Sequence, residues 1–318
     1  MNEHQQFTEL LAYLDSRIVG QTALTRRLVV ALLSSGHLLV EGAPGLAKTT
    51  AIKTLSSCID CSYHRIQFTP DLLPSDLTGT DIYIPEEHSF QFQHGPLFHN
   101  FLLADEINRA PAKVQSALLE AMGEKQITIG KHTYQLPNLF LVMATQNPIE
   151  QEGTYPLPEA QLDRFMFHVK IDYPDAEAEK QILALNRNGY NDDSITKPKL
   201  SQETIFAAQR ALNNIHVAQA VEEYIIQLVL ATRMAAKYDQ QLAKWIRFGA
   251  SPRGTIALER SARAHAWLSG NDYVSPHDVH ALIHEVLRHR ILLTFEAEVE
   301  GITSDQVIDR LLNLVAIP

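Results

Sequence analysis

HLLVEGAPGLAKTT, residues 37–50, decides the fold class of this protein. HLLVEG is a short apolar run that ends in glycine, which is typical of a buried parallel strand, and residues 46–57 have the pattern of a following helix. Between strand and helix, Gly42 and Gly45 precede Lys48 and Thr49, a spacing that lets backbone N–H groups point at an anion. The stretch therefore predicts a strand, a phosphate-binding loop and a helix, in that order.

Ala47 stands where the usual pattern of such loops has its last glycine. Alanine keeps its backbone N–H and is compatible with helical dihedrals, so we expect Ala47 to have a negative φ as the helix begins. On that condition the loop keeps its chemistry, in which Lys48 reaches the β and γ phosphates and the Thr49 hydroxyl holds Mg²⁺.

Apolar runs alternate with helical patterns through the first half of the chain. After residues 37–42, the further candidate strands are RIQF (65–68), FLLADE (101–106), LFLVMATQN (139–147) and FMFHVKI (165–171). Strands that alternate with helices predict an α/β fold with a central parallel sheet covered on both faces. Ligands of such sheets bind at the carboxyl ends of the strands.

Polar residues follow two of these strands and supply candidate catalytic groups. Asp105 and Glu106 end one strand, where Asp105 can bind Mg²⁺ through its water shell and Glu106 can orient and deprotonate an attacking water. Asn147 ends another strand and can hold the same water from the opposite side. Phosphoryl transfer also gains from a cation near the γ phosphate, often from a neighbouring subunit, and Arg164 and Arg253 are our candidates.

Two segments interrupt the alternation, and a different pattern follows them. Residues 81–95 and 125–136 each contain two period-2 runs around a turn, which predicts β-hairpins that project from the sheet or are ordinary surface excursions. After residue 174 the pattern is helical throughout, in 176–185, 201–212, 220–238, 251–268 and 275–289. We therefore expect an α/β domain over 1–174 and an all-α domain over 175–318.

Composition limits the classes of function. The chain has 318 residues, of which 45% are hydrophobic, and a formal net charge of −10 without a basic block. These values favour two domains and argue against a general electrostatic grip on nucleic acid or on an acidic membrane surface. The N-terminus lacks the features of a secretion signal, so we expect a soluble cytoplasmic protein.

Cysteine and histidine patterns offer weaker alternatives. Cys58 and Cys61 have the spacing of a redox or zinc motif, but no second close pair follows, which favours two reduced thiols. His277, His280 and His284 fall at one helical face, and nothing in the sequence shows that they converge on a metal.

Several motifs together carry a resemblance to a known family. The chain resembles the MoxR family of AAA+ ATPases in the ordered motifs IVGQ (18–21), GAPGLAKT (42–49), LLADEINRAP (102–111), ATQNP (144–148), LPEAQLDRF (157–165) and GASPR (249–253), with VLRHR (286–290) in a final helix. This similarity spans nearly the whole chain. It implies an αβα sandwich followed by a helical lid, and the family's phosphate loop also carries alanine at the position of Ala47.

The resemblance also implies roles for residues of this chain. Asp105 and Glu106 would form Walker B, Asn147 would be sensor 1, Arg253 would be sensor 2 in cis and Arg164 the arginine finger in trans, with Arg109 as a rival for a trans contact. Near the adenine would lie Val19, Gly20 and Gln21; Walker A would comprise Gly42, Ala43, Pro44, Gly45, Leu46, Ala47, Lys48, Thr49 and Thr50.

From the same resemblance we expect ATP and Mg²⁺ as cofactors and a homo-oligomeric, hexameric ring. A von Willebrand factor A domain protein and its client would be the partners of a chaperone-like remodeller. Two alternatives stay open: a nucleotide-dependent binding switch with little turnover, and a chelatase-like or DNA motor subunit. The acidic balance argues against the DNA motor.

Overall fold

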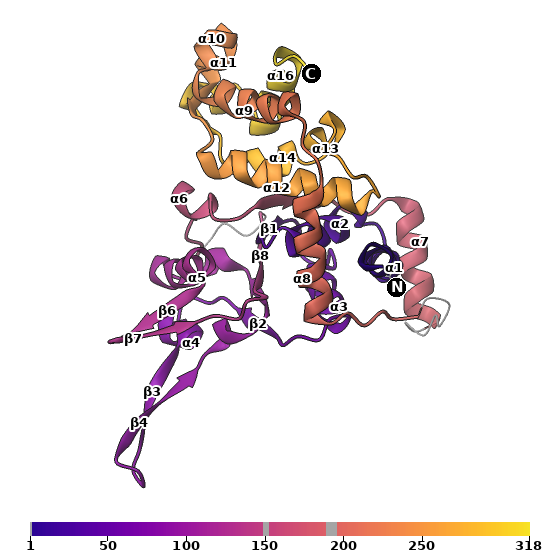
Figure 1. Cartoon of the computed structure of the whole chain (residues 1–318). Helices are drawn as coiled ribbons and strands as arrows, with labels where there is room; N and C mark the ends of the chain where they lie inside the picture. Colours follow the sequence, from indigo (N-terminus) through magenta and orange to yellow (C-terminus); the bar gives the residue numbers. More distant parts are fainter. Residues whose placement is uncertain (1, 149–152, 189–195) are drawn as a thin grey trace.

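A five-stranded parallel sheet lies at the centre of the computed structural model, which describes residues 2–148, 153–188 and 196–318 (Figure 1). All neighbouring strands of this sheet are parallel. In spatial order they are β2 (Tyr63–Gln67), β5 (Phe101–Asp105), β8 (Leu141–Gln146), β1 (Leu38–Glu41) and β9 (Phe167–Lys170). The five strands expected from the sequence are therefore confirmed, within a few residues at their ends.

Both faces of the sheet are buried, which explains why its three inner strands, β5, β8 and β1, are nearly continuous apolar runs. Successive side chains of a strand point to opposite faces, so Leu38 and Val40 belong to one core cluster while Leu39 belongs to the other. The first cluster includes residues of α1 (Glu3–Arg17), α2 (Thr22–Leu33), α3 (Lys48–Ser57) and α8 (Gln202–Ala211). The second includes residues of α4 (Pro74–Thr78) and α5 (Ala112–Glu124).

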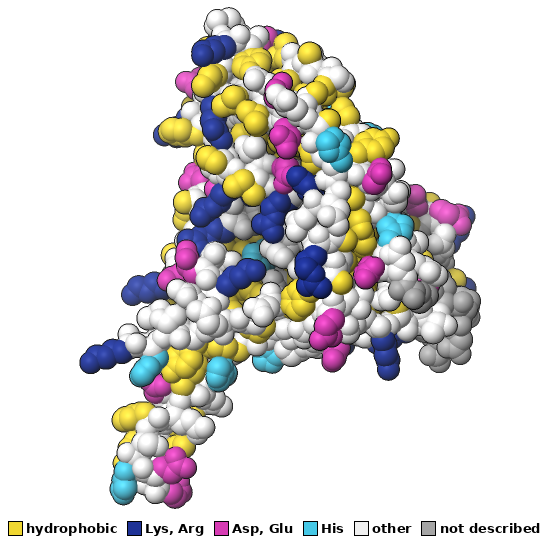
Figure 2. All heavy atoms as spheres, viewed as in Figure 1, with side chains coloured by type: hydrophobic (Ala, Val, Ile, Leu, Met, Phe, Trp, Pro, Cys, Tyr) yellow, Lys and Arg dark blue, Asp and Glu magenta, His cyan; other side chains and the backbone are white. Residues whose placement is uncertain are grey.

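The two expected hairpins are present and lie side by side at one edge of the molecule (Figure 1). They consist of β3 (Gly79–Ile84) with β4 (Ser89–His94), and β6 (Gln126–Ile129) with β7 (His132–Gln135). Figure 2 shows the first hairpin as an arm that extends from the body, and its Phe90 side chain is among the exposed large hydrophobic residues. The rings of Phe92 and Tyr134 stack at 4.2 Å between centroids and join the two hairpins.

Helices dominate the chain beyond residue 174, as expected. They are α7 (Ala176–Asn188), α8, α9 (Gln219–Arg233), α10 (Ala235–Tyr238), α11 (Gln240–Trp245), α12 (Pro252–Leu268), α13 (Pro276–His280), α14 (Ile283–Leu287), α15 (Phe295–Val299) and α16 (Ser304–Leu314). Short 3-10 turns occur at η1 (Pro96–Phe98), η2 (Ile107–Arg109) and η3 (Leu212–Asn214), and α6 (Glu159–Leu162) precedes β9. In these described parts of the chain no helix combines the length and the apolar character that crossing a bilayer requires.

The helical part differs from the sequence expectation in two helix breaks, in one strand pair and in three further helices, α11, α15 and α16, that lie outside the predicted segments; the helix with VLRHR is therefore not the final one. The segments 220–238 and 275–289 each form two helices, with breaks at Met234 and near Leu282. The sequence did not predict these breaks, because the apolar spacing continues across both of them. A short antiparallel pair, β10 (Ile246–Phe248) with β11 (Leu292–Leu293), joins the lid helices and is too short to show strand periodicity. Helix α8 lies beyond residue 174 in the sequence, yet it packs against α1 and α2 of the first domain. The domain boundary near residue 174 therefore stays a prediction.

Candidate nucleotide-binding site

A cavity of about 290 Å³ opens at the carboxyl ends of β1, β5 and β8. Its lining residues are Pro44, Gly45, Leu46, Ala47, Lys48, Thr49, Thr50, Asp105, Glu106, Thr145 and Asn147. Three segments that are far apart in the sequence therefore meet here, because the carboxyl ends of parallel strands share one edge of the sheet.

The loop after β1 is held close to the sheet. The Gly42 N–H donates to the Gln146 carbonyl oxygen at 3.3 Å, and a Cβ on Gly42 would lie 2.4 Å from a side-chain carbon of Ile171. Only glycine fits at that position. Helix α3 begins at Lys48, so its free N-terminal N–H groups face the cavity, as an anion requires.

The Lys48 ammonium group lies over its own loop. It donates to the carbonyl oxygens of Gly42 and Ala43, the second at 3.2 Å. Burial lowers the pKa of Lys48, while the charges of Asp105 and Glu106 act to raise it. The Lys48 ammonium group thus donates only to neutral carbonyl oxygens in these two contacts. A phosphate anion would attract it more strongly than these oxygens do.

The expectation of a negative φ at Ala47 is wrong. Its φ is +56° and its ψ is 17°, which is the left-handed region, and Gly45 in the same loop has a φ of +86°. The loop makes its last turn before α3 at this residue, so the backbone there follows the shape of the loop and not of the helix. Alanine therefore occupies a conformation that glycine adopts without steric cost.

The acidic pair after β5 is tied into a polar network. Asp105 accepts from Arg65 at 3.1 Å and 2.6 Å and, through its other oxygen, from the Thr145 hydroxyl at 2.6 Å. Glu106 has a φ of +57°, and its N–H donates to the same hydroxyl at 2.9 Å. Thr145 thus fixes both acids relative to each other.

The Glu106 carboxylate is occupied in this state. One of its oxygens accepts from the Gln67 amide at 2.9 Å and lies 3.0 Å from Nε of Arg109. Within a single chain, Arg109 therefore contacts the acid that we expect to activate water. Glu106 must exchange at least one of these partners before it can bind a water molecule in the cavity.

The residues present fit a magnesium ion. Thr49 and Asp105 both line the cavity and offer a hydroxyl and a carboxylate oxygen, the type of ligand that Mg²⁺ prefers. The Asp105 carboxylate accepts from Arg65 at 2.6 Å and, through its other oxygen, from the Thr145 hydroxyl at 2.6 Å, so it must exchange one of these partners to bind the ion directly or hold it through a water molecule. Oxygen donors and negative charge are the two properties that such a site needs.

The remaining predicted site residues lie at different distances from the cavity. Asn147 is buried and lines it. Arg164 does not line it, since its guanidinium donates to the Leu119 carbonyl oxygen at 2.6 Å on α5. Arg253, at the start of α12, is 58% exposed and lies 3.5 Å from Asp163.

The segment predicted to lie near the adenine is placed beside the end of β9. The Gln21 amide donates to the Asp172 carbonyl oxygen at 2.9 Å, and Gly20, with a φ of +78°, approaches Pro174 so closely that a Cβ would lie 2.9 Å away. Val19 precedes them in the turn that follows α1. A role in adenine binding stays a prediction.

Sequence reasoning missed three residues of the network: Arg65, Gln67 and Thr145. The signal for the first two was polar residues at alternate positions of RIQF, a strand otherwise expected to be apolar. Strand β2 pairs with β5 so that Gln67 stands opposite Asp105, and that pairing places both side chains at the acids. The sequence alone does not reveal which strands are neighbours.

The cysteine and histidine candidates lie outside the cavity. Burial raises the pKa of the Cys61 thiol to about 12, so this thiol is protonated at neutral pH. His280 and His284 have separate partners, Tyr224 at 2.6 Å and Asp309 at 2.9 Å. In residues 2–148, 153–188 and 196–318 no three histidine, cysteine or acidic side chains form a group that could hold a metal ion.

Fold and site together define an ATPase of the AAA class, and comparisons with known proteins agree. Residues 37–167 match the ATPase family associated with various cellular activities (AAA), and residues 240–311 match the AAA lid domain. A solved structure of a putative ATPase from Cytophaga hutchinsonii superimposes with a TM-score of 0.92 at 46% identity, covering 99% of this chain and 96% of that one.

More particularly, the chain belongs to the MoxR family of AAA+ ATPases. It is 48% identical over 302 residues to chaperone MoxR1 of Mycobacterium tuberculosis, which covers 95% of this chain and 79% of that protein. It is 32% identical over 309 residues to the MoxR protein of Paracoccus denitrificans, covering 92% and 90%.

Proposed function

We propose that this protein is a Mg²⁺-dependent ATPase that hydrolyses ATP to ADP and phosphate. The observation that carries this proposal is the convergence of Lys48, the pair Asp105 and Glu106, and Asn147 on one cavity at the N-terminus of α3. A cation, two acids and an amide around an anion-binding loop form the set that phosphoryl transfer to water requires.

Each residue has a role that follows from its position. The loop N–H groups and Lys48 bind the phosphates, and Lys48 exchanges the carbonyls of its own loop for the phosphate oxygens. Thr49 and Asp105 hold Mg²⁺, which when bound neutralises charge on the phosphate oxygens. Glu106 takes a proton from the attacking water, and Asn147 orients that water.

The cavity lacks a cation for the charge that develops at the γ phosphate, other than Lys48. No arginine occurs among the described residues that line it. We infer that Arg253 reaches the phosphates of its own subunit from the lid and that Arg164 reaches the site of the next subunit. Hydrolysis would then change the angle between the sheet domain and the lid.

The assembly and the biological task extend the same proposal. A trans arginine requires a closed arrangement of identical subunits, which we propose to be a hexameric ring. The similarity to a protein named chaperone MoxR1 supports a chaperone-like remodeller. We further propose that it acts in the cytoplasm with a von Willebrand factor A domain partner. Val19, Gly20 and Gln21 would contact the adenine.

Two variants test the trans assignment. Glu106→Gln removes the base and Arg164→Ala removes the arginine, so each is expected to be inactive alone. A mixture should recover hydrolysis, because a Glu106→Gln subunit supplies Arg164 to a neighbour whose acids are intact. Phosphate release is measured for each variant and for the mixture. A mixture of Lys48→Ala with Glu106→Gln is the control that should not recover, because neither variant has a competent site. Absence of recovery in the mixture would refute the trans role of Arg164.

A direct comparison separates turnover from mere binding. Wild-type protein that binds ATP but releases no more phosphate than Lys48→Ala would be a switch and not an enzyme. The Glu106→Gln variant, immobilised with ATP or with ADP in cell extract, tests the partner: a von Willebrand factor A protein retained only with ATP supports the remodeller, and retention that ignores the nucleotide contradicts it.

A further inference from the structure

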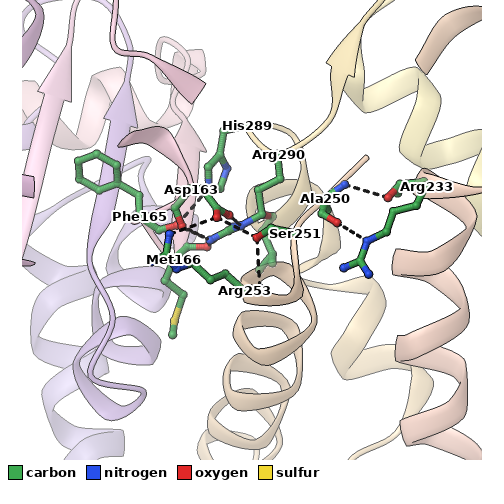
Figure 3. Close-up of polar contacts among 11 residues, drawn as sticks. Asp163, Phe165, Met166, Arg233, Ala250, Ser251, Arg253, His289 and Arg290 are labelled. Carbon is green, nitrogen blue, oxygen red and sulfur yellow. Dashed lines mark hydrogen bonds and ion pairs between the residues drawn. The ribbon is translucent and has the colours of Figure 1, made fainter. Parts of the chain in front are cut away.

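Arg290, a residue of the lid, hydrogen-bonds to the segment Asp163–Met166 between α6 and β9 (Figure 3). Its Nε donates to a carboxylate oxygen of Asp163 at 2.8 Å. One terminal nitrogen donates to the carbonyl oxygens of Phe165 at 2.6 Å and Asp163 at 3.1 Å. The other donates to Met166 at 3.2 Å and to Val286 on the lid itself.

These five contacts use all the N–H donors that a guanidinium has. The Arg290 side chain is 2% exposed, and burial lowers its pKa to about 10, so it remains charged at neutral pH. Lysine has no planar fork and could not reproduce the arrangement. The neighbouring His289 adds a contact to the Phe165 carbonyl oxygen at 3.1 Å.

Asp163 connects Arg290 to the start of α12. Its second carboxylate oxygen accepts from the Ser251 hydroxyl at 2.8 Å and lies 3.5 Å from Arg253. Ser251 is the N-cap of α12, and Arg253 stands in the first turn of that helix. One carboxylate therefore joins Arg290 to the residue that we expect to sense the phosphates.

Arg164 lies inside the gripped segment. The carbonyls of residues 163, 165 and 166 around it are all held by Arg290. Its own N–H donates to Gln161 at 3.1 Å, and its guanidinium lies on α5. A displacement of the lid would thus move the backbone from which the Arg164 side chain starts.

We propose that Arg290 is a positioning residue that, through Asp163, couples the lid of one subunit to the Arg164 side chain offered to the next. The proposal rests on the proposed function, since it needs Arg164 to act in trans. Nucleotide in one site would move Arg253 and the lid, and Arg290 would carry that movement to the neighbouring site. A subunit that lacks Arg290 should hydrolyse ATP itself but fail as a donor of Arg164.

The test uses Arg290→Met in the full chain, which keeps much of the aliphatic length and removes every donor. Alone it should lose at least tenfold in phosphate release, while its affinity for a fluorescent ATP analogue changes less than twofold. Mixed with Glu106→Gln, which carries intact Arg164, it should recover about a quarter of the wild-type rate, since half the sites are competent and half of those have a good neighbour. Mixed with Arg164→Ala, it should recover nothing.

Two further variants control for stability. Arg288→Met removes a lid arginine that crosses the same boundary to the His168 carbonyl oxygen at 3.2 Å without touching residues 163–166, and its activity should stay within twofold of wild type. Asp163→Asn keeps the shape of the site and should give the same mixing pattern as Arg290→Met, with a smaller loss, even where Arg290→Met folds poorly.

The pattern of recovery decides between explanations. Recovery with Arg164→Ala instead of Glu106→Gln would place the defect in the subunit's own site and overturn the proposal. Recovery with neither partner for both Arg290→Met and Asp163→Asn, when Glu106→Gln and Arg164→Ala still rescue each other, would show a structural role only. If those two variants fail to rescue each other, the trans role of Arg164 fails, and the coupling fails with it.

Discussion

Replacement of Ala47 by glycine should stabilise this protein. Ala47 has a φ of +56° at the last turn of the phosphate loop, where an L-residue with a Cβ is strained. Glycine adopts this conformation freely, and it keeps the backbone N–H that would face a phosphate. The substitution removes one methyl group, so its main effect is on the backbone.

The expected magnitude follows from two opposing terms. Left-handed dihedrals cost alanine about 1–2 kcal/mol, and the greater freedom of glycine in the unfolded chain costs about 0.5–1 kcal/mol. Their difference is a gain of about 0.5–1 kcal/mol in the free energy of unfolding for Ala47→Gly. ATP affinity should change by less than about threefold, which corresponds to under 1 kcal/mol.

Ala207→Gly is the matched control. Ala207 lies within α8, where glycine loses freedom without relieving strain, and this variant should lose about 1 kcal/mol. Urea denaturation of both variants and the wild type, without nucleotide, measures the three free energies. If Ala47→Gly is destabilised as much as Ala207→Gly, the strain inferred at Ala47 is absent and the reasoning is refuted.

Three other predictions concern the site and its support. Gly123→Ala should raise helix stability by up to about 1 kcal/mol. It should also reduce ATP hydrolysis, because the new Cβ would lie 2.4 Å from the Arg164 guanidinium and displace it. Thermal melting and phosphate release measure the two effects, and full ATPase activity would contradict the second. Gln67→Ala should raise the rate of ATP hydrolysis about tenfold, because it removes the amide that donates to Glu106 and a hydrogen bond to a charged group is worth about 1.5–3 kcal/mol. A slower rate of hydrolysis would show that Gln67 does not restrain Glu106. Burial lowers the pKa of His37 from 6.5 to about 4, so the unfolded chain binds the proton more tightly, and the free energy of unfolding should fall by up to about 3 kcal/mol as pH drops from 6.5 to 4. Urea denaturation across this pH range should show that the free energy of unfolding depends less on pH in His37→Gln than in the wild type. An equal pH dependence in both proteins would exclude His37 as the cause.

Much of the fold and part of the site follow from local patterns. The three inner strands of the sheet are visible as apolar runs because both faces of a parallel sheet are buried. The pair Asp105 and Glu106 is visible because it ends such a run, and Lys48 because it follows the glycine-containing loop after another run. Parallel strands end at one edge, so the sequence also predicts that these groups meet.

Other features depend on neighbours that the sequence does not identify. The order β2-β5-β8-β1-β9 places Arg65 and Gln67 beside the acids, and hydrophobic patterns do not specify strand order. The sign of φ at Ala47 is set by the shape of the whole loop. The helix breaks in the lid are likewise hidden, since apolar spacing runs through them.

By itself, the sequence determined the αβα architecture, the phosphate loop, the acids and the family resemblance, because strand and helix periodicity and residue chemistry are local properties. Only the tertiary structure decided that Thr145 joins the two acids and that Arg290 reaches across the chain to grip the segment of Arg164. Such contacts depend on direction and distance between remote residues, and the hydrophobic effect that drives folding specifies neither.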